Sequence, residues 1–335
     1  MYAWQATTLG EPEQALSLTD VPTPEPGPGQ VLVRVKATAL NFPDVLLCRG
    51  QYQIRLEPPF VPGVELCGEV VGLGASVDER LLDARVIGNP ILPHGGLAEY
   101  TLMTAAEAYP APDSLDDAEA SALHIAYQTG WFALHRRAHL REGETVLVHA
   151  AAGGVGSAAV QLAKAAGAKV IGVVGGASKA ETARELGADL VIDRKTEDFV
   201  AAVKQYTEGR GADVVFDPVG GDAYTGSAKC IAFEGRIVVV GFAAGVIPSP
   251  ALNHALVKNY SILGLHWGLY KQRDPAAVWA AHEALVKLAD EGAIKPLISE
   301  RIPVQQAIEG LTALGAGATT GRVVVLPSSL ASRPS

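Results

Sequence analysis

The pattern of hydrophobic and polar positions changes twice along the chain. Up to about residue 120, short alternating runs such as "VLVRVKATAL" (31–40) are separated by proline- and glycine-rich stretches. Segments 60–73 and 85–104 have the same character, which is typical of a β-rich, barrel-like domain. A short β pattern returns over residues 295–327. We therefore expect both ends of the chain to form one domain.

Between these two parts, strand patterns alternate with helical patterns. Ser114 followed by Asp117 is a capping signal, and an alanine-rich helical pattern extends from it toward Leu134. Strands rich in valine and isoleucine that alternate with helices predict a parallel sheet covered on both faces. The predicted strands are 145–150, 169–175, 190–193, 213–220, 236–242 and 261–267, and the predicted helices are 154–168, 178–188, 196–208, one between 220 and 236, and 275–291.

The length of the chain also points to two domains. Its 335 residues are more than one ordinary hydrophobic core holds. We predict an α/β protein in which a doubly wound parallel sheet, residues 123–294, is inserted in a β-rich domain made of residues 1–122 and 295–335.

Composition and charge exclude several classes of partner. Hydrophobic residues make up 48% and charged residues 19%, as in a globular protein, and the net charge of −9 disfavours nucleic acid and anionic membranes. Cys48, Cys67 and Cys230 form no C-x-x-C pair, which favours a reducing compartment. The N-terminus lacks signal-peptide features, and the longest apolar run, 237–247, is too short to span a membrane. We expect a soluble, cytoplasmic protein.

The stretch "AAAGGVG" directly follows the strand at 145–150 and begins the next helix. Its spacing fits A-x-x-G-x-x-G, a variant of the dinucleotide-binding pattern in which Ala151 replaces the first glycine. Gly153 allows the backbone to approach a pyrophosphate, and Gly156 allows the helix to pack closely on the strand. An ordinary tight β–α turn is the alternative. The residues predicted to contact the dinucleotide here are Gly153, Gly154, Val155 and Gly156.

The end of the second predicted strand indicates which dinucleotide binds. NAD enzymes place an acidic residue there to hold the ribose 2′-hydroxyl, whereas this chain continues from Gly175 and Gly176 to Ser178 and Lys179. A hydroxyl and an ammonium group suit a 2′-phosphate, and Arg194 follows the third strand. The alternatives are a helix N-cap for Ser178 and solvated surface charges for the two cations. The pattern favours NADPH.

Several motifs that occur in order resemble the medium-chain dehydrogenase/reductase superfamily. They are "GVELCG" (63–68), "HAAAGGVG" (149–156), "LGAD" (186–189), "DVVFDPVGG" (213–221) and "VVVGFAAG" (238–245). The resemblance covers nearly the whole chain. It implies a GroES-like substrate domain with an inserted Rossmann-type domain.

The ligands of the zinc alcohol dehydrogenases in that superfamily are substituted. Val64 stands where the histidine of G-H-E-x-x-G binds catalytic zinc, and Asn41 stands at the place of the upstream zinc cysteine. Residues 80–110 contain no counterpart of the four-cysteine lobe that binds structural zinc. We predict that no zinc is bound, and that Glu65 is a buried acid held by a fixed partner.

Two histidines are the alternative candidates for metal ligands. His135 and His139 lie at i and i+4 on a predicted helix. They lack an acidic third ligand and alternate with Arg136 and Arg137, which favours a solvated helix face.

The stretch "LNFPDVLLCRGQY" (40–52) resembles the zinc-free NADPH:quinone oxidoreductases, the zeta-crystallin-like branch. The resemblance implies that Asn41 and Tyr52 border the substrate pocket. Asn41 is equally compatible with a reciprocal N-cap formed with Asp44, and Tyr52 with a simple interface aromatic. The resemblance also implies residues that surround the nicotinamide: Thr129, Gly241, Phe242 and Ala243. For Phe242, simple packing in the core is the alternative.

The predicted reaction is hydride transfer from NADPH to an electron-poor conjugated acceptor, most simply a quinone, in the cleft between the domains. Such an acceptor delocalises the developing charge, so hydrogen bonds from Asn41 or Tyr52 and a proton from water suffice. Reduction of an enone or enoyl thioester and a non-catalytic NADPH-binding role remain alternatives. The apolar last strand, "YSILGLHW" (260–267), predicts a homodimer through a sheet edge.

Overall fold

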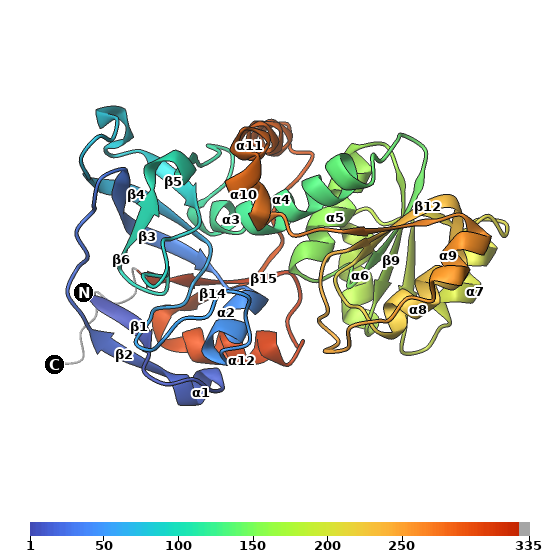
Figure 1. Cartoon of the computed structure of the whole chain (residues 1–335), viewed down its shortest axis with the longest axis horizontal. Helices are drawn as coiled ribbons and strands as arrows, with labels where there is room; N and C mark the ends of the chain where they lie inside the picture. The colour runs from blue at the N-terminus through green and yellow to red at the C-terminus, as the bar shows by residue number, and fades with distance from the viewer. Residues whose placement is uncertain (328–335) are drawn as a thin grey trace. The chain divides into compact units, whose positions relative to one another are not determined.

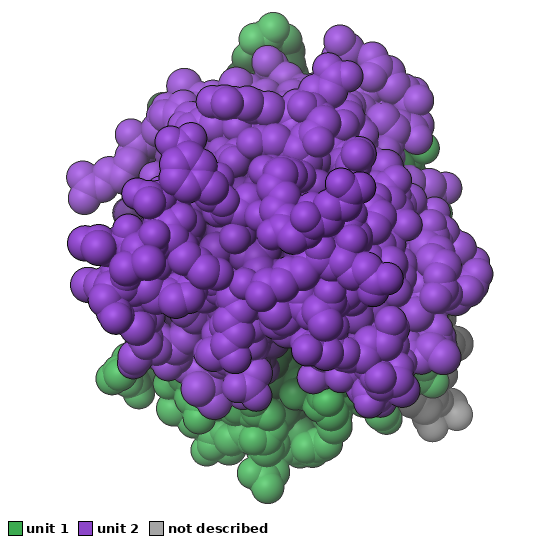
Figure 2. All heavy atoms as spheres, turned by 90° about the vertical axis from the view of Figure 1, so that its right-hand side faces the viewer, with its two compact units in different colours: residues 1–125, 296–335 green, residues 126–295 purple. Residues whose placement is uncertain are grey.

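The computed structural model describes residues 1–327, so the last eight residues of the predicted first domain, 328–335, lie outside it. The chain divides into two compact units, which Figure 2 colours separately. Unit 1 comprises Met1–Ile125 together with the segment that begins at Pro296, and unit 2 is the continuous segment Ala126–Lys295. Unit 1 is therefore assembled from two stretches that are far apart in the sequence.

Unit 1 contains a seven-stranded sheet and a separate two-stranded sheet. Its elements are β1 (Tyr2–Ala6), α1 (Pro12–Ala15), β2 (Leu16–Asp20), β3 (Gln30–Ala39), α2 (Phe42–Cys48), β4 (Leu66–Leu73), β5 (Arg85–Gly88), β6 (Tyr100–Thr104), β7 (Tyr109–Pro110), α3 (Asp117–Ser121), β14 (Ile298–Pro303), α12 (Ala307–Gly315) and β15 (Arg322–Leu326). The order is β14-β15-β3-β4-β5-β7, with β6 also paired to β3. β14 and β15 are parallel, whereas β15 pairs antiparallel with β3. This last pairing joins the C-terminal segment to the N-terminal one.

The prediction of short strands throughout 295–327 is wrong for Ala307–Gly315, which form helix α12. Ala307 and Leu311 are buried at helical spacing, and Gly310 packs so closely that an added Cβ would lie 2.7 Å from Leu40 Cδ1. The glycine and threonine content of "AIEGLTALG" lowers its intrinsic helical propensity, and tertiary packing overrides that preference.

Unit 2 is a six-stranded parallel sheet with helices on both faces (Figure 1). Its elements are β8 (Thr145–His149), α5 (Gly154–Ala165), β9 (Lys169–Val174), α6 (Ala177–Glu185), β10 (Leu190–Asp193), α7 (Phe199–Tyr206), β11 (Ala212–Asp217), α8 (Asp222–Cys230), β12 (Ile231–Val239), α9 (Leu252–Lys258), β13 (Ser261–Gly264), α10 (Gly268–Arg273) and α11 (Pro275–Asp290); α4 (His124–Trp131) begins at the end of unit 1. The strand order β10-β9-β8-β11-β12-β13 confirms the predicted doubly wound sheet. Every residue of β8 is buried, which explains its continuous apolar run.

Local details around α3 and α4 differ from the prediction. The capping box is formed by Asp116 and Glu119 rather than by Ser114 and Asp117. The helical pattern toward Leu134 is divided into α3, α4 and a π-helical turn, Phe132–Arg137.

The two histidines considered as ligands do not share a helix face. His135 lies in the π-helical turn with its ring 4.2 Å from that of Trp131, and burial lowers its pKa. His139 lies beyond the turn with φ +49°.

The three cysteines, Cys48, Cys67 and Cys230, are buried free thiols. Within residues 1–327, no helix combines the length and the apolar character needed to cross a membrane.

Candidate functional site

The loop after β8 is shaped by its backbone. Ala150 adopts a left-handed conformation, and Gly153, the N-cap of α5, donates its N–H to Ala150 O at 2.8 Å. A Cβ at Gly156 would lie 2.1 Å from Ala150 O, so only glycine fits there. The first-turn N–H groups of α5 have no partner within the helix, and helix ends of this kind are suited to anions.

Ala151 replaces the first glycine of the dinucleotide pattern without disturbing the loop. Its side chain is fully buried, and a Cβ at Gly172 of β9 would lie 3.0 Å from it. The missing side chain of Gly172 therefore provides the room for Ala151. The predicted contact residues Gly153, Gly154 and Val155 remain partly exposed at the start of α5.

The loop after β9 has no carboxylate of its own. Gly176 is the N-cap of α6 with φ +110°, and Ser178 is an exposed residue inside the first turn. The N-cap alternative for Ser178 is therefore wrong, because glycine holds that position.

Cations gather beside this loop. A Cβ at Gly175 would lie 3.4 Å from Arg194 Nε, so the guanidinium group lies against the loop. Lys179 is half-buried, and its pKa is lowered by burial first and then by Lys195 and Arg194. The structure thus brings Lys179 and Arg194 together at the end of β9 and adds Lys195, which sequence reasoning missed.

The loop after β12 is tied to the loop after β11. Gly241 N donates to Asp217 O at 3.4 Å, and Ala243 N donates to Pro218 O at 3.1 Å. Both loops follow the carboxyl ends of their parallel strands, where open α/β sheets bind ligands.

Phe242 and Thr129 differ in exposure. Phe242 is 38% exposed and contacts Gly220, where an added Cβ would lie 2.9 Å from its ring, so it is not a core residue. Thr129 is buried on α4.

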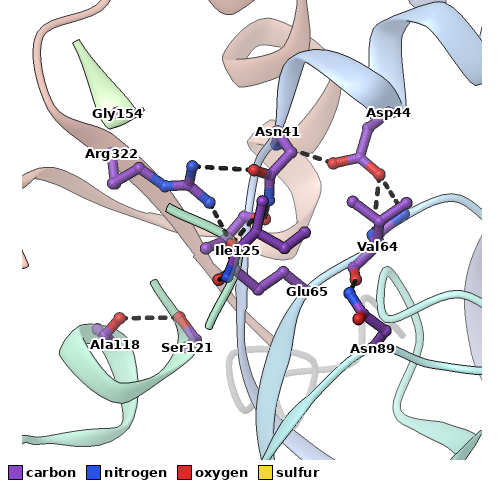
Figure 3. Close-up of polar contacts among 12 residues, drawn as sticks. Asn41, Asp44, Val64, Glu65, Asn89, Ala118, Ser121, Ile125, Gly154 and Arg322 are labelled. Carbon is purple, nitrogen blue, oxygen red and sulfur yellow. Dashed lines mark hydrogen bonds and ion pairs between the residues drawn. The ribbon is translucent and has the colours of Figure 1, made fainter. Parts of the chain in front are cut away.

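In unit 1, Asn41, Glu65 and Arg322 form a buried network, which Figure 3 shows. Arg322 Nη1 donates to Asn41 Oδ1 at 2.9 Å, and Arg322 Nη2 donates to Glu65 Oε2. Asn41 Nδ2 donates to the same Glu65 oxygen at 2.9 Å, and Ile125 N donates to Glu65 Oε1 at 2.6 Å. A guanidinium only donates and a carboxylate only accepts, so the network fixes the orientation of the Asn41 amide. Glu65 is confirmed as a buried acid with a fixed partner.

The network limits what Asn41 can do. Its second amide hydrogen is donated to Ala39 O at 3.0 Å, so both side-chain donors are used within unit 1. Its backbone N–H donates to Asp44 Oδ2 at 2.8 Å, and the reciprocal capping box predicted for Asn41 and Asp44 is confirmed at the start of α2. Only the acceptor capacity of Oδ1 remains for a ligand.

The residues at the position of the zinc site, around Val64, do not fit a metal. Val64 packs in the hydrophobic core, and its N–H donates to Asp44 Oδ1 at 2.9 Å. Asp44 also accepts from Gly63 N at 2.8 Å, and burial raises its pKa to about 6. Glu65 forms an ion pair with Arg322. Among residues 1–327, no three His, Cys, Asp or Glu side chains are grouped so as to hold a metal ion.

Tyr52 retains a free polar group. Its ring packs against the core of unit 1, while within residues 1–327 its hydroxyl has no hydrogen-bond partner. Burial, followed by the charge of Asp44, raises its pKa, so the phenol stays protonated at neutral pH.

Arg322 was not identified from the sequence. The available signal was an arginine at the start of the otherwise apolar strand "RVVVL", where a buried charge requires a buried partner.

Comparisons with known proteins agree with this architecture. The alcohol dehydrogenase GroES-like family matches residues 27–113, and the zinc-binding dehydrogenase family matches residues 154–283. A quinone oxidoreductase-like protein 2 homolog of Nematostella vectensis is 40% identical over 304 residues, 89% of this chain and 82% of the relative.

Two solved structures extend the similarity to the whole fold. A mycobacterial protein complexed with NADPH has a TM-score of 0.90 at 30% identity, covering 98% of this chain and 100% of that one. The CurK enoyl reductase has a TM-score of 0.87 at 26% identity, covering 97% and 98%. The chain is therefore an oxidoreductase of the medium-chain dehydrogenase/reductase superfamily and belongs to its quinone oxidoreductase branch.

Proposed function

We propose that this protein uses NADPH to reduce a quinone or a similar conjugated acceptor, without zinc. The observation that carries the cofactor preference is the end of β9, where Lys179 and Arg194 gather and the loop lacks an acidic side chain. The NADPH complex of the mycobacterial structural neighbour supports the same cofactor. A 2′-phosphate carries about two negative charges near neutral pH and accepts charge-assisted hydrogen bonds.

The proposed cofactor contacts come from unit 2. The N–H groups of Gly154, Val155 and Gly156 suit the pyrophosphate, and Gly153, whose own N–H is donated to Ala150 O, allows its close approach. Ser178 with the two cations suits the 2′-phosphate, and Thr129 with the loop 241–243 suits the nicotinamide end. When bound, the cofactor supplies a hydride from C4 of its nicotinamide ring.

Tyr52 and Asn41 have different proposed roles. Tyr52 has a protonated hydroxyl with no partner among residues 1–327, so it is the group that donates a hydrogen bond to the acceptor oxygen. Asn41 has no donor left and contributes a fixed Oδ1 acceptor at the pocket border. Water supplies the proton, and no side chain of the network acts as a dedicated acid.

We expect no zinc requirement because of the residues that stand at the position of the zinc site. Val64 has no donor atom, and Glu65 and Asn41 are engaged in the network with Arg322. Elemental analysis of the purified, untagged protein should find no stoichiometric zinc, and chelators should leave its activity unchanged. One zinc per chain would overturn this proposal.

Reduction of an α,β-unsaturated carbonyl or enoyl thioester is the second candidate, favoured by the similarity to the CurK enoyl reductase. A panel containing a benzoquinone, an enone and a crotonyl thioester, assayed by NADPH oxidation, separates the two. We expect the highest kcat/KM with the quinone. A higher value with the thioester favours the second candidate, and no turnover of any acceptor favours a non-catalytic role.

The cofactor preference can be measured directly. Two charge-assisted hydrogen bonds, each contributing about 1.5–3 kcal/mol before screening, predict that NADPH binds about two powers of ten more tightly than NADH. Lys179→Ala and Arg194→Ala should each raise the Kd for NADPH and leave that for NADH nearly unchanged, most clearly at low salt. Lys204→Ala, in the last turn of α7, is the control. Equal wild-type affinity for both cofactors would refute the proposal.

We also propose a homodimer formed through β13. The strand lies at an edge of the unit 2 sheet, as the sequence predicted. The preceding helix α9 exposes Leu252 by 74%, Leu256 by 76% and Val257 by 73%. An apolar edge of this kind is protected when a second copy pairs with it. Light scattering should give the mass of a dimer at micromolar concentration, and Leu256→Lys should shift it toward a monomer.

A further inference from the structure

The ends of β9 and β10 are joined by one carboxylate. Asp193, the last residue of β10, accepts two hydrogen bonds on its Oδ1 atom, from Gly176 N at 2.8 Å and from Lys195 N at 3.0 Å. Gly176 belongs to the loop before α6, whereas Lys195 belongs to the loop after β10. The side chain therefore links the two loops, in addition to the backbone bond from Arg194 N to Val174 O at 3.0 Å.

Three cations surround the joined loops. A Cβ at Gly176 would lie 3.7 Å from Lys195 Nζ, and one at Gly175 would lie 3.4 Å from Arg194 Nε. The positive charges of Lys195 and Arg194 contribute to the lowered pKa of Lys179, after burial. The side chains thus converge on the N-terminal end of α6.

The Asp193 carboxylate balances only part of the positive charge of Arg194 and Lys195: backbone hydrogen bonds from Lys195 and Gly176, and then the charges of Lys195 and Arg194, lower its pKa. Asp193 directs its Oδ1 to backbone N–H groups, and Glu197 Oε1 accepts from Asp193 N at 3.1 Å. Within the described residues, the side chains of Arg194 and Lys195 make no hydrogen bond or ion pair. Two cations beside a single carboxylate leave a net positive charge, so Arg194 and Lys195 favour an anion of high charge.

We propose that Lys195 is a third cation for the 2′-phosphate, and that Asp193 is the positioning residue that holds it beside Arg194. The inference rests on the proposed use of NADPH. It assigns the specificity of the pocket to the loop after β10 as much as to the loop after β9. Asp193 acts through hydrogen bonds to the backbone, and its charge opposes the phosphate.

The role of Lys195 is tested by binding, without turnover. Calorimetry with 2′,5′-ADP and with 5′-AMP isolates the contribution of the 2′-phosphate. Lys195→Gln should weaken 2′,5′-ADP binding about tenfold at low salt, as expected for one partly screened charge-assisted hydrogen bond, and leave 5′-AMP binding unchanged. Its affinity for 2′,5′-ADP should also depend less on salt. Lys204→Gln, remote in α7, should change neither ligand.

The role of Asp193 is tested by two substitutions with opposite expected effects. Asp193→Asn keeps an oxygen acceptor for both N–H groups and removes a negative charge, so 2′,5′-ADP should bind about threefold more tightly. Asp193→Ala removes the acceptor as well, so binding should weaken about fivefold although the charge change is the same. The melting temperature of each variant shows whether the fold is intact.

The outcomes separate this inference from the proposed cofactor. Equal wild-type affinity for 2′,5′-ADP and 5′-AMP refutes the use of NADPH itself. A wild-type preference for 2′,5′-ADP that Lys195→Gln leaves unchanged refutes only the third cation. Tighter binding in both Asp193 variants shows that the carboxylate acts through charge alone and refutes its positioning role.

Discussion

The phosphate loop of unit 2 and the Asn41 network of unit 1 are both polar sites, but they are built from different parts of the chain. The loop consists of consecutive residues, and its shape depends on backbone contacts such as the one between Gly156 and Ala150 O. The network joins side chains from distant segments, because Asn41 and Arg322 are 281 positions apart in the sequence. The shape of the loop therefore depends on positions that lack a Cβ, whereas the stability of the network depends on charges that neutralise one another.

Removing one charge from the network should have the largest effect. Arg322→Met leaves Glu65 buried without its guanidinium, which typically costs about 3–5 kcal/mol of unfolding free energy. Denaturant unfolding measures this loss. Arg301→Met is the matched control, because Arg301 is 46% exposed in its pair with Asp116 and should cost less than about 1 kcal/mol.

A double substitution tests the balance itself. Arg322→Met with Glu65→Gln removes both charges, so it should be less destabilised than Arg322→Met alone. Additive losses would show that the two side chains contribute independently, contrary to the arrangement in Figure 3.

Adding one methyl group to the loop should have the next largest effect. Gly156→Ala brings a Cβ to within 2.1 Å of Ala150 O, so the backbone must shift, at a cost of about 2–3 kcal/mol. Gly153→Ala meets the same oxygen at 3.2 Å and should cost less than about 1 kcal/mol. Differential scanning calorimetry should rank the two variants in this order, and similar losses would contradict the role given to backbone contact.

Two buried groups, one in each unit, should respond to acid with opposite signs. Burial lowers the pKa of His149, at the end of β8, to about 4, so the unfolded state binds more protons below pH 6.5 and stability is lost as the pH falls. Burial raises the pKa of Asp44 to about 6, so the folded state binds more protons between pH 6 and 4 and stability is gained as the pH falls.

Single substitutions expose each contribution. Between pH 7.5 and 5, the unfolding free energy of Asp44→Asn should fall by at least about 2 kcal/mol, because the His149 effect, to which His135 adds, is no longer opposed by Asp44. The unfolding free energy of His149→Gln should rise by about 1 kcal/mol over the same range. Unfolding free energies across this pH range provide the measurement. Parallel profiles for the two variants would contradict the assignment of opposite signs.

Tyr52→Phe should change activity and leave stability unaltered, because it removes one hydrogen-bond donor and leaves the network intact. We expect kcat for a quinone to fall about tenfold, equivalent to about 1.4 kcal/mol, with no change in the Kd for NADPH. Tyr206→Phe, at a 39% exposed site in unit 2, should leave kcat unchanged. An unaltered kcat in Tyr52→Phe would show that the acceptor oxygen finds its donor elsewhere.

Much of unit 2 was predictable because its signals are local. Each buried strand is a short run of valine and isoleucine, and a helix follows most of them, so a parallel sheet covered on both faces could be predicted from sequence. Helix α12 was missed because its helical conformation depends on packing rather than on propensity. The capping box was misplaced by two residues because several acidic and hydroxyl side chains near residue 115 fit the same pattern.

The sites divide in the same way. The glycine loop could be located because its residues are contiguous and their spacing has a steric reason. The partner of Glu65 could not, because no local rule connects a glutamate in the N-terminal half with an arginine near the C-terminus. Lys195 was missed for another reason: its position beside Gly176 depends on how two loops meet.

The division of unit 1 into two segments has a consequence for how the protein is made. During synthesis, unit 2 leaves the ribosome as one continuous segment before β15 exists, so it can complete its core first. The sheet of unit 1 closes only when Val324 and Val325 reach Ala39 and Thr38. Until then, Glu65 lacks its counter-charge. The nascent N-terminal segment therefore stays open to chaperones and proteases for nearly the whole time of translation.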